Sequence, residues 1–182
     1  MRTEPTNFEA LKRGFESGEI PAIAGFSGSF YNRLCPPRKL SRIILETETE
    51  FLSLTIQEVT GHNSVIVPRG ESHSLRRVAE RMIEKELTFQ RLAHGDSLDP
   101  DLHDPDWFRK CQSIDRDFDF EQLAPLVLTD LKPSLARHDP DSVFSLSHGD
   151  GSHRSLVYAV RLLRGLENFH PVEAIYFSPR EF

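Results

Sequence analysis

Cysteine is scarce in this chain of 182 residues, which contains only Cys35 and Cys111. A disulfide framework, or a zinc site built on cysteines, needs more thiols than these two. The fold must therefore rest on an apolar core, and hydrophobic residues make up 38% of the composition. The length fits one domain with additions, because a domain usually has about 100–150 residues.

Long hydrophobic runs are also missing. The longest stretch without charge extends from Ile20 to Asn32 and is interrupted by Pro21, Gly25 and Gly28, whereas a membrane-spanning helix needs about 20 apolar residues. The segment from Met1 to Gly18 alternates charges and has no apolar stretch of the kind found in a signal peptide. We therefore expect a soluble, cytoplasmic protein without a membrane span.

An excess of positive charge is absent as well. The chain has 22 Lys and Arg against 28 Asp and Glu, and its net charge of −6 argues against a uniformly basic nucleic-acid-binding surface. The acidic excess is local, because Asp96 to Glu121 holds eight aspartates and one glutamate against three basic residues. Ser152 to Arg164, in contrast, holds three arginines and no acid. A polyanion, if one binds, is expected there.

The apolar periodicity predicts an α/β (α+β) fold. We expect helices over Asn7–Ser17, from Leu75 to about Leu92, from Asp104-Pro105 through Phe108, and over Ser152–Gly165. We expect strands over Arg42–Leu45, Glu50–Val59, Leu126–Leu128, Val143–Leu146 and Pro171–Phe177. Ile20 to Lys39 is rich in Gly, Pro and Ser and is expected to be mostly loop.

The most informative stretch is Asp150-Gly151-Ser152-His153-Arg154, between an expected strand and an expected helix. Glycine lets the main chain turn tightly and approach a ligand, and the N–H groups at the start of a helix favour phosphate. Arg154 can add a bidentate contact to phosphate oxygens. The same residues also fit a plain strand-to-helix turn, with Ser152 as N-cap and Arg154 on a solvated face.

The stretch from Val143 to Phe177 resembles the core of the ParB/sulfiredoxin superfamily. In that core a strand leads into a Gly-x-His-Arg or Gly-Glu-Arg-Arg type turn, followed by an apolar helix and a Pro-Val-like strand. The corresponding residues here are Phe144-Ser145-Leu146, the Gly151–Arg154 turn, Leu156–Leu163 and Pro171-Val172, and Ala124–Leu128 looks like the upstream Pro-Ile-x-Val strand. The resemblance covers Leu123 to Phe177, under a third of the chain. It implies a mixed sheet with flanking helices, in a single domain whose core lies at about 64–92 and 123–178. An N-terminal elaboration over 1–60 and an acidic insertion over 96–121 are added to this core.

In this superfamily the turn cradles nucleotide phosphates. The resemblance therefore implies that Gly151, Ser152, His153 and Arg154 bind ATP or another nucleotide, with Mg²⁺ as a further cofactor. Charge stabilisation by Arg154 and the helix N-terminus can carry most of the catalysis. Asp150 can orient a water toward a phosphate, although it is equally a turn former, and His153 completes the candidate catalytic residues.

The superfamily also brings polar side chains of an upstream helix to the phosphates. The helix that begins at Leu75 is the candidate, because Arg77 and Arg81 lie four residues apart and share a face. A solvated face on which these arginines pair with Glu80 and Glu84 fits the pattern equally well.

This sequence differs from two branches of the superfamily. Sulfiredoxins place a catalytic cysteine in the turn, and this chain has Ser152 there, so sulfiredoxin-type repair is not expected. Partition proteins continue into a helix-turn-helix domain, whereas this sequence ends about five residues after the last expected strand. Size and a lone core most resemble the stand-alone, plasmid-encoded fertility-inhibition (Osa-like) members, which have ATPase and DNase activity and inhibit transfer of plasmid DNA or T-DNA by type IV secretion.

Two other groups of ligand-type side chains are weaker candidates. Asp115, Asp117 and Asp119 alternate, which would put three carboxylates on one face of a strand, either as a Mg²⁺ site or as a solvated or partner-binding surface. An EF-hand is excluded, because the required glycine and glutamate are missing. His148 and His153 are spaced in a way that matches no recognised ligand pattern.

Two functions from different classes follow. The first is a nucleotide-binding hydrolase that cleaves ATP or a DNA phosphodiester at the Gly151–Arg154 turn. The second is a non-catalytic module that responds to nucleotide or DNA and docks a protein of a DNA-transfer system through its acidic segment. The lack of a recognisable base favours the second and the family resemblance favours the first, which we take as the main expectation.

Overall fold

The computed structural model describes residues 1–17, 39–57, 66–68, 70–98, 104–123, 125–130, 144–146 and 151–178. The strands in these ranges are β1 (Arg2–Thr6), β2 (Lys39–Leu45), β3 (Thr55–Gln57), β4 (Ser72–Ser74), β5 (Leu126–Asp130), β6 (Phe144–Leu146) and β7 (Val172–Ser178). The helices are α1 (Phe8–Ser17), α3 (Glu48–Leu52), α4 (Leu75–Glu84), α5 (Phe89–Ala93), α6 (Pro105–Arg116), the short 3₁₀ helix η1 (Phe120–Gln122) and α7 (Ser152–Leu163). None of the helices described here is long and apolar enough to cross a lipid bilayer.

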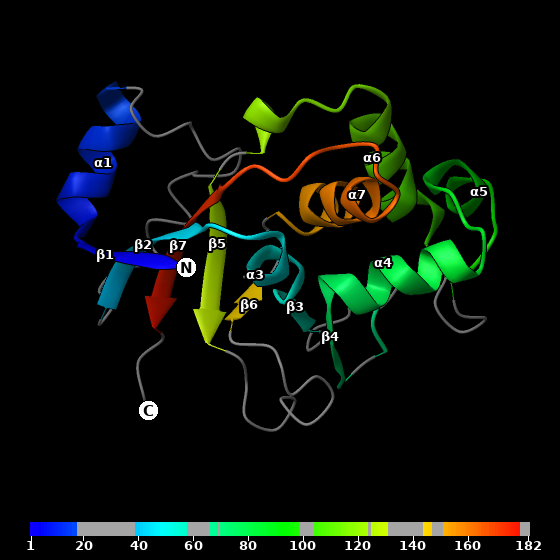
Figure 1. The fold of residues 1–182 in the computed structure, drawn as a ribbon, viewed down its shortest axis with the longest axis horizontal. Helices are drawn as coiled ribbons and strands as arrows, with labels where there is room; N and C mark the ends of the chain where they lie inside the picture. Colours follow the sequence, from blue (N-terminus) through cyan, green and yellow to red (C-terminus); the bar gives the residue numbers. More distant parts are fainter. Residues whose placement is uncertain are drawn as a thin grey trace.

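The seven described strands form one mixed sheet in the order β1-β2-β7-β5-β6-β3-β4 (Figure 1). The pairs β5–β7 and β3–β6 are parallel, and the other neighbouring pairs are antiparallel. Figure 1 shows α1 at one end of the molecule and α4, α5, α6 and α7 grouped at the other. This architecture confirms the expected α/β class, with a mixed sheet and flanking helices.

The elements β5, β6, α7 and β7 carry the expected site. β5 and β6 are antiparallel, with Leu128 opposite Leu146, and α7 leads into β7 on the other side of β5. Leu126 and Leu128 point to the same face of the sheet, because side chains two residues apart in a strand share a face. Both belong to the core cluster that also contains Leu156 and Ala159 of α7. This face of the sheet is therefore the one on which α7 packs.

The helix α7 is buried on nearly all sides. Between Ser152 and Val160 only His153 and Arg154 escape full burial. The ring of Tyr158 packs against Phe51 of α3, with ring centroids 5.1 Å apart, and its hydroxyl accepts a hydrogen bond from the backbone N–H of His170. The middle of α7 is thus held by core packing.

Most of the expected elements are confirmed. The helices over Asn7–Ser17 and Ser152–Gly165 are α1 and α7, and the helix expected at Asp104-Pro105 is α6, which continues to Arg116. The strands expected over Arg42–Leu45, Leu126–Leu128, Val143–Leu146 and Pro171–Phe177 are β2, β5, β6 and β7. The short strands β1 and β4 were not expected. The loop expected from Ile20 falls outside the described residues up to position 38.

The strand expected over Glu50–Val59 is wrong in its first half, where the chain forms α3. Thr47 is the N-cap: its hydroxyl accepts from the Glu50 N–H, and the Glu50 carboxylate accepts from the Thr47 N–H. This capping box stabilises a helix start. Phe51 and Leu52 are both fully buried, which a helix permits and an alternating strand does not.

The helix expected to run from Leu75 to about Leu92 is two helices. α4 ends at Glu84, and Glu86 adopts a left-handed φ of 53°, which interrupts the helix. The hydroxyl of Thr88 then accepts a hydrogen bond from the N–H of Arg91 and starts α5. Apolar residues keep the spacing of a helix on both sides of Glu86, so the sequence pattern did not reveal the interruption.

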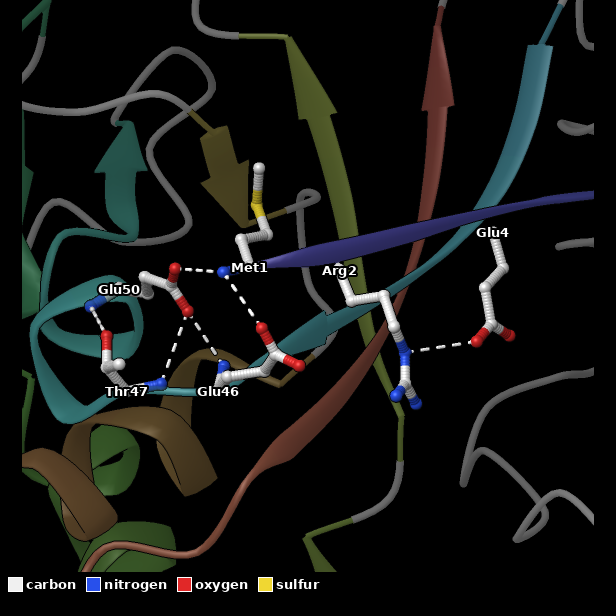
Figure 2. A network of polar contacts seen from close by, with 6 residues as sticks. All are labelled: Met1, Arg2, Glu4, Glu46, Thr47 and Glu50. Atoms are coloured by element: carbon white, nitrogen blue, oxygen red, sulfur yellow. Dashed lines mark hydrogen bonds and ion pairs between the residues drawn. The ribbon is translucent and has the colours of Figure 1, made fainter.

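The edge strand β1 is attached to α3 through the amino group of Met1, which lies between the carboxylates of Glu46 and Glu50 (Figure 2). The Glu50 carboxylate also accepts from the backbone N–H groups of Glu46 and Thr47. The hydrogen bond to Glu50 is the largest cause that raises the pKa of the amino group. On the same strand, Arg2 pairs with Glu4 at 3.1 Å.

Candidate functional site

Gly151 is the first described residue of the expected phosphate turn and the N-cap of α7. Its φ of 82° and ψ of −11° are left-handed, and its carbonyl accepts a hydrogen bond from the N–H of Ser155 at 2.8 Å. A Cβ added here would lie 3.0 Å from Cδ2 of Leu126 in β5. The position therefore favours glycine for two reasons, backbone conformation and space. Asp150 and His148 lie outside the described residues.

The N-terminus of α7 differs from those of the other described α-helices. Side chains accept hydrogen bonds from backbone N–H groups at the starts of α1, α3, α4, α5 and α6, and the residues concerned are Asn7, Thr47, Ser74, Thr88 and Asp104. The glycine N-cap of α7 provides no such acceptor. The alternative in which Ser152 is the N-cap is therefore wrong, because Ser152 is the first residue of the helix.

Two buried hydroxyl groups lie at this uncapped helix start. Ser152 is 1% exposed and Ser155 is 0% exposed, and neither Oγ has a hydrogen-bond partner in the described part of the chain. The Oγ of Ser155 is 3.8 Å from the position that a Cβ on Gly151 would take, which places it against the turn. Buried polar atoms without partners are rare and cost about 1–3 kcal/mol each. An acceptor atom of a ligand would remove that cost.

His153 stacks on Trp107 of α6, with ring centroids 4.3 Å apart and an angle of 28° between the planes. Trp107 is the third residue of α6 and is 5% exposed. From the sequence, Trp107 is expected in a short helix, and nothing in the sequence assigns it to the site. No local pattern could have done so, because the contact joins two helices that are distant in the sequence.

The helices α6 and α7 run in the same direction. Two contacts join them. Trp107 stacks on His153, and eight residues further along each helix Arg161 donates to the Asp115 carboxylate at 2.9 Å. The two positive helix ends therefore lie together. At α6 the carboxylate of Asp104 already accepts from the first N–H groups. At α7 no side chain in the described ranges does so.

Arg154 is the third residue of α7 and is partly buried, so its charge lies at the same helix end as the two hydroxyls. Arg77 and Arg81 belong to α4, which packs against α7. The charges of both help to lower the pKa of His73 in β4. Their contribution to the phosphate site stays a prediction.

The acidic segment is largely engaged within the fold. Asp115 belongs to α6 and binds Arg161, Asp117 pairs with Arg116 at 2.7 Å, and the side chain of Asp119 accepts from the N–H of Glu121 at the start of η1. The three carboxylates are therefore not on one face of a strand. In the parts of the chain with described coordinates, no group of three or more His, Cys, Asp or Glu is arranged to hold a metal ion.

The thiol of Cys111 does not reach this site as a reactive group. It lies in the core on α6 and is fully buried, and this burial raises its pKa well above the usual value. A thiol of this kind is a poor nucleophile. Cys35 lies outside the described residues.

A cavity of about 320 Å³ lies between α1 and the strands β1 and β2. The cation in its lining, Arg42, binds the Glu173 carboxylate at 2.5 Å and lies 3.9 Å from Glu4. The hydrogen bond to Glu173 is the largest cause that raises the pKa of Arg42. Two carboxylates thus neutralise this guanidinium, which makes the cavity unsuitable for a phosphate.

Family models, curated proteins and solved structures were compared with this chain, and none of them matches it. The chemistry of the site therefore rests on its own residues. From Gly151 to Ser155 the chain offers backbone N–H groups, two hydroxyls, an imidazole and a guanidinium, and no carboxylate. Such a set of donors suits an anion.

Replacing Gly151 by alanine is expected to lower the free energy of unfolding by about 2–3 kcal/mol. The left-handed backbone costs about 1–2 kcal/mol for a residue with a Cβ, and displacing the buried Leu126 adds about 1 kcal/mol. Gly165→Ala is the matched control, because its φ is 66° and nothing lies within 4 Å of the added Cβ. Urea unfolding measures both, and equal losses would contradict the steric role of Leu126.

Acidification below about pH 6.5 is expected to destabilise the protein through His73. This side chain is 3% exposed, and burial, followed by the charge of Arg77, lowers its pKa. The unfolded chain then binds a proton that the folded chain does not, so the free energy of unfolding decreases as the pH falls below the pKa of a free imidazole. In urea unfolding from pH 7.5 to 5.5, His73→Gln should show a smaller decrease than the wild type. The control is His94→Gln, which changes an exposed histidine and should retain the wild-type pH dependence.

Proposed function

We propose that the N-terminus of α7 binds the phosphates of a nucleotide, in the manner implied by the resemblance to ParB/sulfiredoxin proteins. One observation carries the proposal. A helix without a side-chain cap begins at a left-handed glycine, and beside it two fully buried hydroxyls have no partner among the described residues. A phosphate can accept hydrogen bonds from all of these groups at once.

Each residue of the turn has a separate role in this proposal. Gly151 lets the backbone approach the phosphate, and the first N–H groups of α7 donate to it. Ser152 and Ser155 donate their hydroxyl protons, and Arg154 supplies positive charge at the same helix end. His153, held by Trp107, is a further donor when its ring nitrogen carries a proton.

We extend the proposal to hydrolysis of ATP or of a DNA phosphodiester. Arg154 and the N-terminus of α7 stabilise the negative charge that develops on the transferred phosphoryl group. Asp150 is the candidate to orient the attacking water. Gly151 to Ser155 offers no carboxylate to hold Mg²⁺, so the ion would enter only with the nucleotide, where it would neutralise phosphate charge.

The resemblance to the Osa-like members extends the proposal to a cellular role, inhibition of plasmid or T-DNA transfer by type IV secretion. It is supported by the resemblance of the turn and by a core in which β5, β6 and β7 share one sheet and α7 leads into β7. DNA and a protein of the transfer system are the partners that this role implies.

The alternative, a non-catalytic module that docks a partner through its acidic segment, has less support. Asp104 and Asp119 cap helices, and Asp115 is bound by Arg161. Trp107 and Phe108 of the same segment lie in the core. Asp106 and Asp117 remain exposed and pair with neighbouring arginines of their own segment, so they are the carboxylates that this alternative would use.

Removal of the two unpaired hydroxyls is expected to stabilise the free protein and to weaken nucleotide binding. Ser152→Ala with Ser155→Ala should raise the free energy of unfolding by about 2 kcal/mol or more, because two buried polar atoms without partners are lost at about 1–3 kcal/mol each. The same variant should bind ATP about tenfold more weakly, as measured by calorimetry. A merely structural role for these serines predicts no loss of affinity.

Ser145→Ala is the matched control for this double variant. Ser145 is 2% exposed, and its hydroxyl donates to the carbonyls of Thr55 and Leu146 at 3.3 and 3.2 Å. Its removal should destabilise the protein by about 1 kcal/mol and leave ATP affinity unchanged. If neither ATP nor CTP binds the wild type, with or without Mg²⁺, the proposed function is wrong.

Arg154→Ala is expected to abolish ATP hydrolysis and plasmid nicking without unfolding the protein, because charge stabilisation is lost while the core is retained. Phosphate release and agarose-gel nicking assays measure the two activities, and circular dichroism checks the fold. Arg109→Ala removes an exposed arginine of α6 that pairs with Asp106, three residues earlier on the same helix, and it should retain both activities. Unchanged turnover in Arg154→Ala would refute hydrolysis at this site.

A further inference from the structure

The stacked rings of Trp107 and His153 connect α6 to the first turn of α7. The ring centroids are 4.3 Å apart and the planes are inclined by 28°, so the two faces overlap. His153 is the second residue of α7, between Ser152 and Arg154. The indole thus contacts the middle of the group of residues that we assign to phosphate.

The same helix pair is joined a second time near its other end. Arg161 donates to the side chain and to the backbone carbonyl of Asp115, at 2.9 and 3.2 Å, and its guanidinium lies 4.8 Å from the ring centroid of Phe118. The helices are thus attached near both ends, and both contacts would be lost if α7 slid or rotated relative to α6. A displacement of Trp107 would therefore be transmitted to the first turn of α7.

Packing alone does not distinguish Trp107 from its neighbour. Phe108 follows it on α6, is 0% exposed and belongs to the same core cluster. Only Trp107 stacks on a residue of the turn. Trp107 also has an indole N–H without a hydrogen-bond partner among the described residues. These two features give Trp107 a link to the site that Phe108 does not have.

We propose that Trp107 is a positioning residue of the phosphate site, which holds the His153 ring and the first turn of α7 in the geometry that binds a triphosphate. This inference rests on the proposed function. Stacking of two rings contributes free energy in addition to the burial of their apolar surface, and this contribution favours one ring orientation. A preorganised site binds more tightly, because less side-chain freedom is lost on binding.

The test compares four forms of the full chain by calorimetric titration with ATP and with inorganic tripolyphosphate. Trp107→Leu removes the aromatic face and should weaken both ligands by about tenfold, whereas Trp107→Phe retains a ring and should stay within about threefold of the wild type. Phe108→Leu is the matched control. It removes a ring from the same helix and should lower the unfolding temperature while its affinity remains within about threefold of the wild type.

A spectroscopic measurement keeps the test valid if Trp107→Leu does not fold. Trp107 is the only tryptophan of the chain, so the intrinsic emission reports this one position. Saturation of the wild type with ATP should change the emission, and His153→Gln should abolish most of that change. An emission that does not respond to bound ATP would overturn the proposal.

The possible outcomes distinguish failure of the proposed phosphate binding from failure of the role assigned to Trp107. If the wild type binds neither ATP nor tripolyphosphate, the proposed function fails, and this inference fails with it. If the wild type binds and Trp107→Leu binds equally well, or if Phe108→Leu loses as much affinity, the inference alone is overturned.

Discussion

The structure depends on the burial of α7 against the sheet. The start of this helix lies so close to Leu126 that its N-cap has no room for an unstrained side chain, and the left-handed backbone there also favours glycine. Glycine cannot cap the helix with a side chain, so the constraint that packs α7 also leaves its first N–H groups without the side-chain acceptor that the other described α-helices have. Dense packing and an uncapped helix start thus have one cause.

The second consequence of this burial is the pairing of α7 with α6. Parallel helices bring two positive ends together, which is unfavourable unless negative charge compensates them. Asp104 compensates the end of α6, and Asp115 binds Arg161 further along the pair. The acidic segment therefore has a structural explanation in the fold, and the end of α7 keeps its preference for an anion.

Local patterns predicted much of the fold. Alternation and short apolar runs identified β5, β6 and β7, and Asp104 before Pro105 identified the start of α6, because caps and strand periods depend on neighbouring residues. The failures have the same origin. At Glu50 a capping box with Thr47 outweighed an apparent alternation, and at Glu86 one left-handed residue divided a continuous apolar period into two helices. At each of these positions a preference for one backbone conformation opposed the pattern of apolar residues, and the pattern alone could not show which of the two was stronger.

The sequence by itself determined the turn at Gly151, the helix after it and the donor groups that the turn presents, because backbone preference and helix period are properties of adjacent residues. Only the tertiary structure decided which distant groups meet that turn. It placed Trp107 on His153, and it brought the charges of Arg77 and Arg81 close enough to His73 to lower the pKa of that imidazole. Contacts such as Arg161–Asp115 join residues 46 positions apart. They follow from how the core packs, since no local period relates the two partners.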